Sequence, residues 1–166
     1  MMAEETKLKS IIHIARAQKE DKATIMALAA EDHAESIFGD LPFSERKFST
    51  LFDRSINQPE RCITLKAEVK GKIVGFLYCN LGEYFIAENN LQANVHVVYV
   101  KEELRHNMLS GKIAVKLIKA ITKWAKAQGV QHVLFYVTSG TRITQTDSFF
   151  RKMGMTTLGG NYAIRV

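Results

Sequence analysis

A histidine in a β-prone segment is the residue of this sequence best suited to acid–base chemistry. Residues 91–100 favour a strand, and four alternating positions would then share one face: Asn94, His96, Val98 and Val100. Imidazole titrates at about pH 6.5, so it can accept a proton under neutral conditions. His96 is therefore a candidate general base. The alternative interpretation is a strand histidine in a polar cavity.

Basic residues outnumber acidic ones by 23 to 17, which gives a formal net charge of +6. This balance favours an anionic partner, such as nucleic acid, an acidic protein or a phosphate-bearing cofactor. Lysines recur at helical spacing along one segment: Lys112, Lys116, Lys119, Lys123 and Lys126. Such a stripe is usually a solvated helix face. We therefore expect any nucleic-acid binding to be weak, non-specific and steeply salt-dependent.

The cysteines and histidines form no known metal motif, and we expect no metal. Cys62 and Cys79 are too few for a disulfide scaffold. Lys70-Gly71 suits a two-residue hairpin turn, and both cysteines lie equally far from it. This register predicts that they are directly opposite, with Cα atoms about 4.5–5.5 Å apart. We expect free thiols in a reducing cytoplasm.

Hydrophobic periodicity predicts a chain that mixes strands and helices. The predicted strands are residues 11–17, 61–69, 72–81, 91–100 and 130–137, with two short strands in the tail 155–166. The predicted helices run from residue 19 past 31, from a cap at Ser44, from the segment after residue 105 to Gln128, and over 141–153.

Hairpin-linked strands before the long helix favour an α/β (α+β) fold with a mixed, mostly antiparallel sheet. We expect six to seven strands flanked by about four helices. Residues 1–166 are predicted to form a single domain, with residues 1–10 as a flexible tail. No apolar run is long enough to span a bilayer and no signal peptide is evident, so the expectation is a cytoplasmic protein without a membrane partner.

Motifs along nearly the whole chain resemble those of the GNAT acetyltransferases, in the same order. They are Ile14-Ala-Arg16 with Glu20-Asp21, Gly71-Lys-Ile-Val-Gly75-Phe, Val98-Tyr-Val100-Lys-Glu-Glu-Leu-Arg105 and Phe149-Phe150-Arg-Lys-Met-Gly154-Met. The resemblance implies a GNAT-like fold. It also implies transfer of an acetyl group from acetyl-CoA to an amine, by direct attack in a ternary complex.

The family binds coenzyme A pyrophosphate at a Q/R-x-x-G-x-G/A loop that leads into a helix. Counted from the strand, Arg105 fills the Q/R position, and Met108 and Ser110 fill the small positions. Counted back from the helix, the same pattern falls four residues later, on residues 109–114. We therefore infer that the loop is enlarged by four residues, 105–108. The expected phosphate cradle is Ser110, Gly111, Lys112, Ile113 and Ala114. For Arg105 and Lys112 the alternative is an ordinary surface position.

The resemblance also assigns roles around the thioester. The backbone near Val98 and Val100 would bind the pantetheine arm, where the fourth strand separates from the fifth. Asn94 and His96 would lie beside the thioester, and arylalkylamine N-acetyltransferases carry histidines at both positions. An amine with a pKa of about 10 must lose a proton before attack, and His96 would take it, directly or through a water. Asn94 with a bound water is the alternative.

The resemblance also places Phe150 among the residues expected to bind the cofactor, at the position where many members of the family carry a tyrosine that protonates the leaving thiolate. Phenylalanine cannot donate a proton. Tyr136, Tyr162 or water would then supply it.

A second hypothesis is an inactive GNAT-like binding module that uses its basic face on an anionic partner. The single glycine of the cradle, Gly111, and Phe150 favour it, whereas His96 and Ala114 favour the enzyme. The acceptor stays open between small-molecule and protein amines, including lysine side chains, N-termini, polyamines, aminoglycosides and modified nucleobases. A homodimer is as compatible with the sequence as a monomer.

Overall fold

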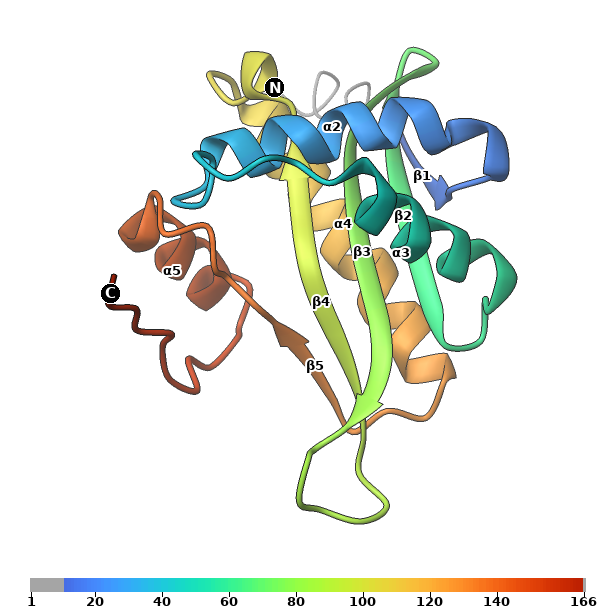
Figure 1. The fold of residues 1–166 in the computed structure, drawn as a ribbon, viewed down its shortest axis with the longest axis vertical. Helices are drawn as coiled ribbons and strands as arrows, with labels where there is room; N and C mark the ends of the chain where they lie inside the picture. Colours follow the sequence, from blue (N-terminus) through green and yellow to red (C-terminus); the bar gives the residue numbers. More distant parts are fainter. Residues whose placement is uncertain (1–10, 166) are drawn as a thin grey trace, which may run out of the picture.

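The computed structural model describes residues 11–165 as one sheet with helices on both faces (Figure 1). The expected flexible tail, residues 1–10, lies outside the described residues. The strands are β1 (Ile12–Arg16), β2 (Cys62–Val69), β3 (Lys72–Glu83), β4 (Leu91–Val100) and β5 (His132–Phe135). They are neighbours in sequence order, antiparallel up to β4 and parallel between β4 and β5. The predicted mixed, mostly antiparallel sheet is confirmed.

Four helices flank the sheet, as expected: α2 (Lys22–Glu35), α3 (Glu45–Asn57), α4 (Met108–Ala127) and α5 (Ile143–Lys152). Short 3-10 turns, η1 (Lys19–Asp21) and η2 (Glu102–Leu104), precede α2 and α4. The Ser44 hydroxyl accepts a hydrogen bond from the backbone N of Lys47 at 3.3 Å, which confirms the predicted cap of α3. Gly129 follows α4 with φ of 74°, the left-handed conformation that ends many helices.

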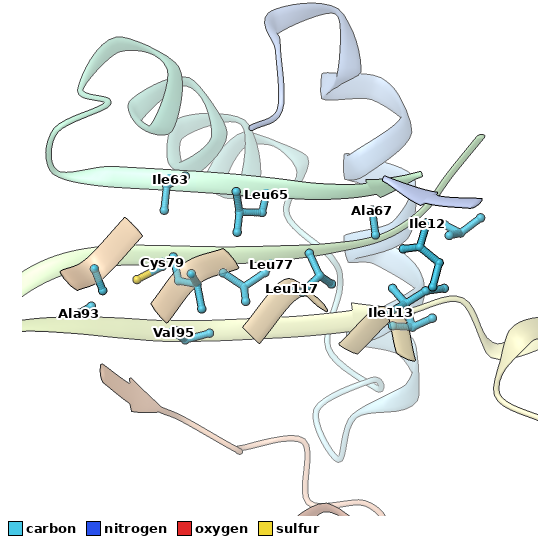
Figure 2. Close-up of a cluster of buried hydrophobic side chains, with 14 residues drawn as sticks. Ile12, Ile63, Leu65, Ala67, Leu77, Cys79, Ala93, Val95, Ile113 and Leu117 are labelled. Atoms are coloured by element: carbon cyan, nitrogen blue, oxygen red, sulfur yellow. The ribbon is translucent and has the colours of Figure 1, made fainter. Parts of the chain in front are cut away.

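Two apolar layers hold the helices to the sheet. On one face, Ile113 and Leu117 of α4 pack against β2, β3 and β4 (Figure 2), and Ile121 belongs to the same cluster. These residues recur at every fourth position, so they form one stripe along the helix. On the other face, α2 and α3 cover a cluster that includes Phe76 and Tyr99. Both faces of β4 are therefore buried over part of its length.

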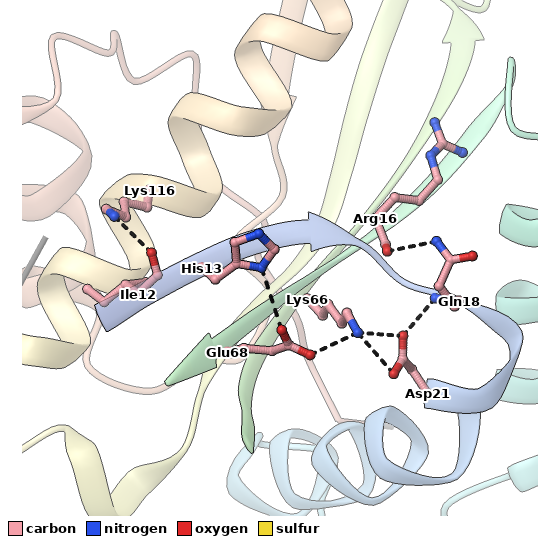
Figure 3. Close-up of polar contacts among 8 residues, drawn as sticks. All are labelled: Ile12, His13, Arg16, Gln18, Asp21, Lys66, Glu68 and Lys116. Atoms are coloured by element: carbon pink, nitrogen blue, oxygen red, sulfur yellow. Dashed lines mark hydrogen bonds and ion pairs between the residues drawn. The ribbon is translucent and has the colours of Figure 1, made fainter. Parts of the chain in front are cut away.

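A network of charges ties the start of α2 to the sheet (Figure 3). Lys66 of β2 lies 3.0 Å from Asp21 and 2.9 Å from Glu68. The hydrogen bond to Glu68 is the main reason why the pKa of Lys66 is raised. On the other face of the sheet, Lys116 donates to the carbonyl of Ile12 at 2.9 Å, which joins α4 to β1.

The predicted pairing of the two cysteines is wrong. The ladder begins at the Lys70-Gly71 turn as expected, but Val74 is an extra residue in β3 that shifts the register. Cys62 consequently pairs with Asn80, and Ile63 pairs with Cys79. The cysteines lie on opposite faces of the sheet, because paired residues share a face. Both thiols are free and buried.

Among residues 11–165 the sheet has five strands, not six to seven, because residues 155–165 of the tail form none. Residues 155–165 have no strand or helix. Large apolar side chains of the tail are exposed: Leu158 by 79%, Tyr162 by 96% and Ile164 by 87%. Alternating apolar residues form a strand only where a partner edge pairs with them, and the tail pairs with none of the described strands.

Candidate functional site

β4 and β5 run side by side over only part of β4. Their parallel pairing ends at Val95 and Phe135, and the backbone N of Tyr136 makes the last hydrogen bond, 2.9 Å from the carbonyl of Val95. β4 continues to Val100, whereas the chain after Phe135 turns away towards α5 (Figure 1). The two strands therefore separate, as the sequence comparison with GNAT motifs led us to expect.

The far half of β4 presents backbone groups that do not pair with β3 to this separation. The N–H of Lys101 bonds the carbonyl of Val74 on β3 at 2.9 Å. Because successive residues of a strand direct their N–H and C=O to opposite edges, Val98 and Val100 direct theirs away from β3. These groups face the side on which β5 has already ended.

A cavity of about 380 Å³ occupies the separation. It lies between the end of β4, the first turns of α4, and α5. Seven of the residues predicted to bind the cofactor line it: Val98, Val100, Arg105, Ser110, Gly111, Ala114 and Phe150. Lys112 and Ile113 do not line it. Ile113 is instead fully buried in the core between α4 and the sheet.

The start of α4 corrects the predicted loop. The helix begins at Met108, and the side chain of Asn107 caps it by accepting from the backbone N of Leu109 at 2.8 Å. The free amides at a helix start are those of the N-cap and the first three helical residues, here 107–110, and the amide of Leu109 is already taken by the cap. Ser110 therefore offers an N–H group, whereas the N–H groups from residue 111 onwards belong to the helical hydrogen-bond ladder.

Of the residues assigned to the enlarged loop, Arg105 to Asn107 do lie in the connection between η2 and α4, whereas Met108 is already helical. Met108 follows Arg105 at the spacing of the GNAT pattern counted from the strand, and the helix begins at this residue.

Arg105 is held by the protein itself. Its guanidinium pairs with Glu35 of α2, and its Nε donates to the carbonyl of Val100 at 2.8 Å. It also lies 4.9 Å from the centroid of the Tyr99 ring. The Tyr99 hydroxyl in turn donates to Glu35 at 3.0 Å and to Glu31 at 3.1 Å. Arg105 thus fixes α2 against the end of β4 and lines the cavity without being a free cation.

Sequence reasoning missed Asp32, a carboxylate of α2 that lines the same cavity. Burial, and then repulsion by Glu35, raise the pKa of Asp32 to about 6, although Arg105 and His33 act in the opposite direction. Glu31, Asp32 and Glu35 could be placed on one helix from the sequence. Nothing in the sequence showed which strand this helix faces.

His96 and Asn94 lie where β4 and β5 separate, but neither of them lines the cavity. Val97 pairs with Tyr78 and Val95 with Cys79, so His96 is the extra residue of a β-bulge. The bulge reverses the alternation of side chains beyond it. Val98 and Val100 pack on the α4 side, whereas Asn94 and His96 face the α2 and α3 side. The predicted common face of the four residues is therefore wrong.

The imidazole of His96 is held in a defined position. Its Nε2 lies 2.5 Å from Oδ1 of Asn80, and its ring stacks on Tyr136 with 5.5 Å between centroids and 10° between planes. The Tyr136 hydroxyl donates to Oδ1 of Asn94 at 3.2 Å. Burial lowers the pKa of His96. The neutral imidazole, which is the form that accepts a proton, is therefore favoured.

The two other predicted aromatic residues lie differently. Phe150 lines the cavity and contacts the ring of Phe135, with centroids 5.3 Å apart. Tyr162 is almost fully exposed in the tail. Of the two tyrosines considered as proton donors, only Tyr136 touches His96.

The sequence matches the Acetyltransferase (GNAT) family over residues 12–155. The chain belongs to this family. No curated protein matches it closely enough to count as a relative. Among residues 11–165, no three His, Cys, Asp or Glu side chains could together hold a metal ion. None of the helices in the same residues is long and apolar enough to cross a bilayer.

Solved structures of several other proteins are similar in fold. A ribosomal-protein-alanine N-acetyltransferase from Brucella melitensis biovar Abortus 2308 is 17% identical, with a TM-score of 0.67, and 93% of this chain and 99% of that chain are covered. A glucosamine-6-phosphate N-acetyltransferase from Arabidopsis thaliana is 15% identical, with a TM-score of 0.67 and coverage of 93% and 97%. A transcriptional regulator from Bacillus halodurans C-125 is 14% identical, with a TM-score of 0.70 and coverage of 93% and 99%. At these identities the likeness concerns the fold alone.

Proposed function

We propose that this GNAT protein transfers an acetyl group from acetyl-CoA to an amine by direct attack in a ternary complex. One observation carries the proposal: β4 and β5 separate beside the N-terminus of α4 and leave a cavity between them. A helix N-terminus favours a phosphate, and an unpaired strand edge favours an amide-bearing chain such as pantetheine. The two features adjoin the same cavity.

The residues present fit coenzyme A. Ser110 offers a free amide at the helix start, and no atom lies within 4 Å of the position that a Cβ of Gly111 would take. A phosphate can therefore approach this backbone closely. Val98 offers an N–H and a C=O group along the arm, and Val100 offers its N–H, since the Val100 carbonyl already accepts from Arg105. Glu35 does not repel the phosphates with an unpaired negative charge, because Arg105 forms an ion pair with it. Bound acetyl-CoA would supply a thioester as the acyl donor.

The acid–base work falls to the residues at the bulge of β4. His96 is neutral at physiological pH, because burial lowers its pKa, and accepts the proton that the attacking amine must lose. Tyr136, stacked on His96, is the described tyrosine nearest to this base and the best placed proton donor for the thiolate. Phe150 forms part of the cavity wall and takes no proton.

Binding and transfer are measured separately to test the proposal. Acetyl-CoA should raise the melting temperature in a thermal-shift assay, because it binds the folded state alone. Release of free thiol with a panel of amines then reports transfer. The absence of both stabilisation and thiol release would contradict the proposal. Stabilisation without release, for every class of amine, would support the inactive binding module instead.

A further inference from the structure

The orientation of the Asn80 side chain is fixed by its neighbour in β3. Its Nδ2 donates to the carbonyl of Leu81 at 3.2 Å. A carbonyl oxygen accepts hydrogen bonds only, so this contact identifies the nitrogen of the amide. The opposite atom, Oδ1, is the one that lies 2.5 Å from Nε2 of His96.

This contact decides which nitrogen of His96 carries the proton. An amide oxygen cannot donate, so Nε2 must be the donor. A neutral imidazole has a single N–H, and its other nitrogen then holds a lone pair. Nδ1 of His96 has no hydrogen-bond partner among residues 11–165.

The neighbouring side chains fix the position of the His96 ring without favouring its charged form. Tyr136 stacks on one side and Tyr78 contacts the ring with 6.1 Å between centroids. Tyr136 is itself held by its hydrogen bond to Asn94. No described carboxylate or cation shifts the pKa of His96, since burial is its only cause. Asn80 is therefore the polar group that sets the state of the ring.

We propose that Asn80 is a positioning residue that holds His96 as the Nε2–H tautomer, and that Nδ1 is the atom that accepts the amine proton. This inference rests on the proposed role of His96 as the base. The amine nitrogen forms the new C–N bond, the C–S bond breaks with its electron pair left on sulfur, and the proton from nitrogen moves to Nδ1. The Nε2–H bond to Asn80 persists throughout, so the imidazolium is stabilised as it forms.

Two substitutions separate this role from a merely structural one. Asn80→Leu keeps a similar volume and removes the acceptor, so both tautomers become populated. Asn80→Asp keeps an acceptor and adds a negative charge, which favours the imidazolium and raises the pKa of His96. The acid limb of the rate profile should move to higher pH in Asn80→Asp and to lower pH in Asn80→Leu, where the imidazolium loses its acceptor.

The decisive measurement is ¹⁵N NMR of the His96 imidazole in the free protein, which reports the tautomer without any turnover. We expect the Nε2–H form in the wild type and in Asn80→Asp above its pKa, and a mixture in Asn80→Leu. The kcat of Asn80→Leu should fall by roughly 10–100-fold with little change in KM for acetyl-CoA. An Nδ1–H tautomer in the wild type would overturn the inference.

Failure of the proposed function would give a different result from failure of the inference about Asn80. If the wild type shows the Nε2–H form but His96→Ala keeps full activity, Asn80 sets the tautomer of a histidine that is not the base. That result removes the catalytic part of the inference and leaves acetyl transfer to be judged by the thiol assay. Should Asn80→Leu fail to fold, Asn80→Asp with its shifted pH profile still tests the contact.

Discussion

At the scale of single residues, His96 carries the proposed proton transfer. Burial lowers its pKa, so the acid limb of kcat/KM should lie below the ordinary imidazole value and the rate should rise with pH along that limb. His96→Ala should lower kcat by roughly 10²–10⁴-fold, the range expected for general-base catalysis. The affinity for acetyl-CoA should hardly change, because the predicted contacts are with the backbone of Val98 and Val100. A pH–rate profile of both proteins checks this, and identical profiles would leave Asn94 with a bound water as the candidate.

Asp32 gives a prediction about stability. Its pKa in the folded protein is about 6, above the value of roughly 3.9 in an unfolded chain. The folded state therefore binds this proton more tightly. The resulting stabilisation is complete below about pH 4 and is lost as the pH rises through about 6. Asp32→Asn should thus raise the free energy of unfolding by roughly 1–3 kcal/mol at about pH 8 and by little at about pH 4.

Urea unfolding at the two pH values tests the Asp32 prediction. Asp40→Asn is the control, because Asp40 has a largely exposed side chain. It should change stability by less than about 0.5 kcal/mol at either pH. An equal effect of Asp32→Asn at both pH values would mean that Asp32 titrates normally in the folded protein.

At the scale of elements, the sequence predicted those features that depend on residues close together in the chain. The bounds of β4, the Ser44 cap and the glycine after α4 follow from side-chain types within a few residues of each other. The bulges at Val74 and His96 do not, since a bulge depends on which residues of the neighbouring strand pair across it. The consequence was large: the common face of β4 and the opposition of the cysteines were both wrong.

The candidate site, too, was predicted where its residues are close together in the chain and missed where separate elements meet. Most of the residues predicted to bind the cofactor line one cavity because they belong to one continuous segment, the end of β4 and the start of α4. Asp32, Asn80 and Glu35 were missed because they reach the site from other elements. Glu35 and Arg105, for example, are far apart in sequence and meet only when α2 packs on the sheet.

The first turn of α4 supplies a test of the phosphate site. No atom lies within 4 Å of a Cβ added to Gly111, so the free protein accommodates a side chain there. Gly111→Ala should stabilise the fold by about 0.5–1 kcal/mol, since glycine is unfavourable within a helix. Gly111→Val should weaken acetyl-CoA binding by steric exclusion of the phosphate.

Calorimetric titration with acetyl-CoA measures the effect of Gly111→Val. Lys119→Val, on the exposed side of the same helix, is the matched control and should bind as the wild type does. If Gly111→Val also binds as the wild type does, the pyrophosphate must lie elsewhere.

At the scale of the whole molecule, the positive charge is the property that could bring a second kind of ligand. The chain carries a net charge of +6, and three lysines on the exposed side of α4 contribute to it: Lys119, Lys123 and Lys126. Charges on one helix face attract a phosphate backbone without reading bases. We therefore expect weak binding of any DNA duplex. The affinity should fall steeply as the salt concentration rises, because the release of counterions on binding then becomes less favourable.

Fluorescence anisotropy with two duplexes of unrelated sequence, at several salt concentrations, measures this binding. Replacing Lys119, Lys123 and Lys126 together by alanine should reduce the slope of log K against log salt by about 2–3, because roughly 0.9 counterions are released for each phosphate neutralised. Acetyl transfer should be unaffected, since none of the three residues lines the cavity. A complex that prefers one sequence and persists at high salt would require contacts with base edges, which a stripe of lysines does not provide. Such a complex, together with undiminished binding by the triple variant, would place the nucleic-acid surface away from α4 and give the binding module priority over the enzyme.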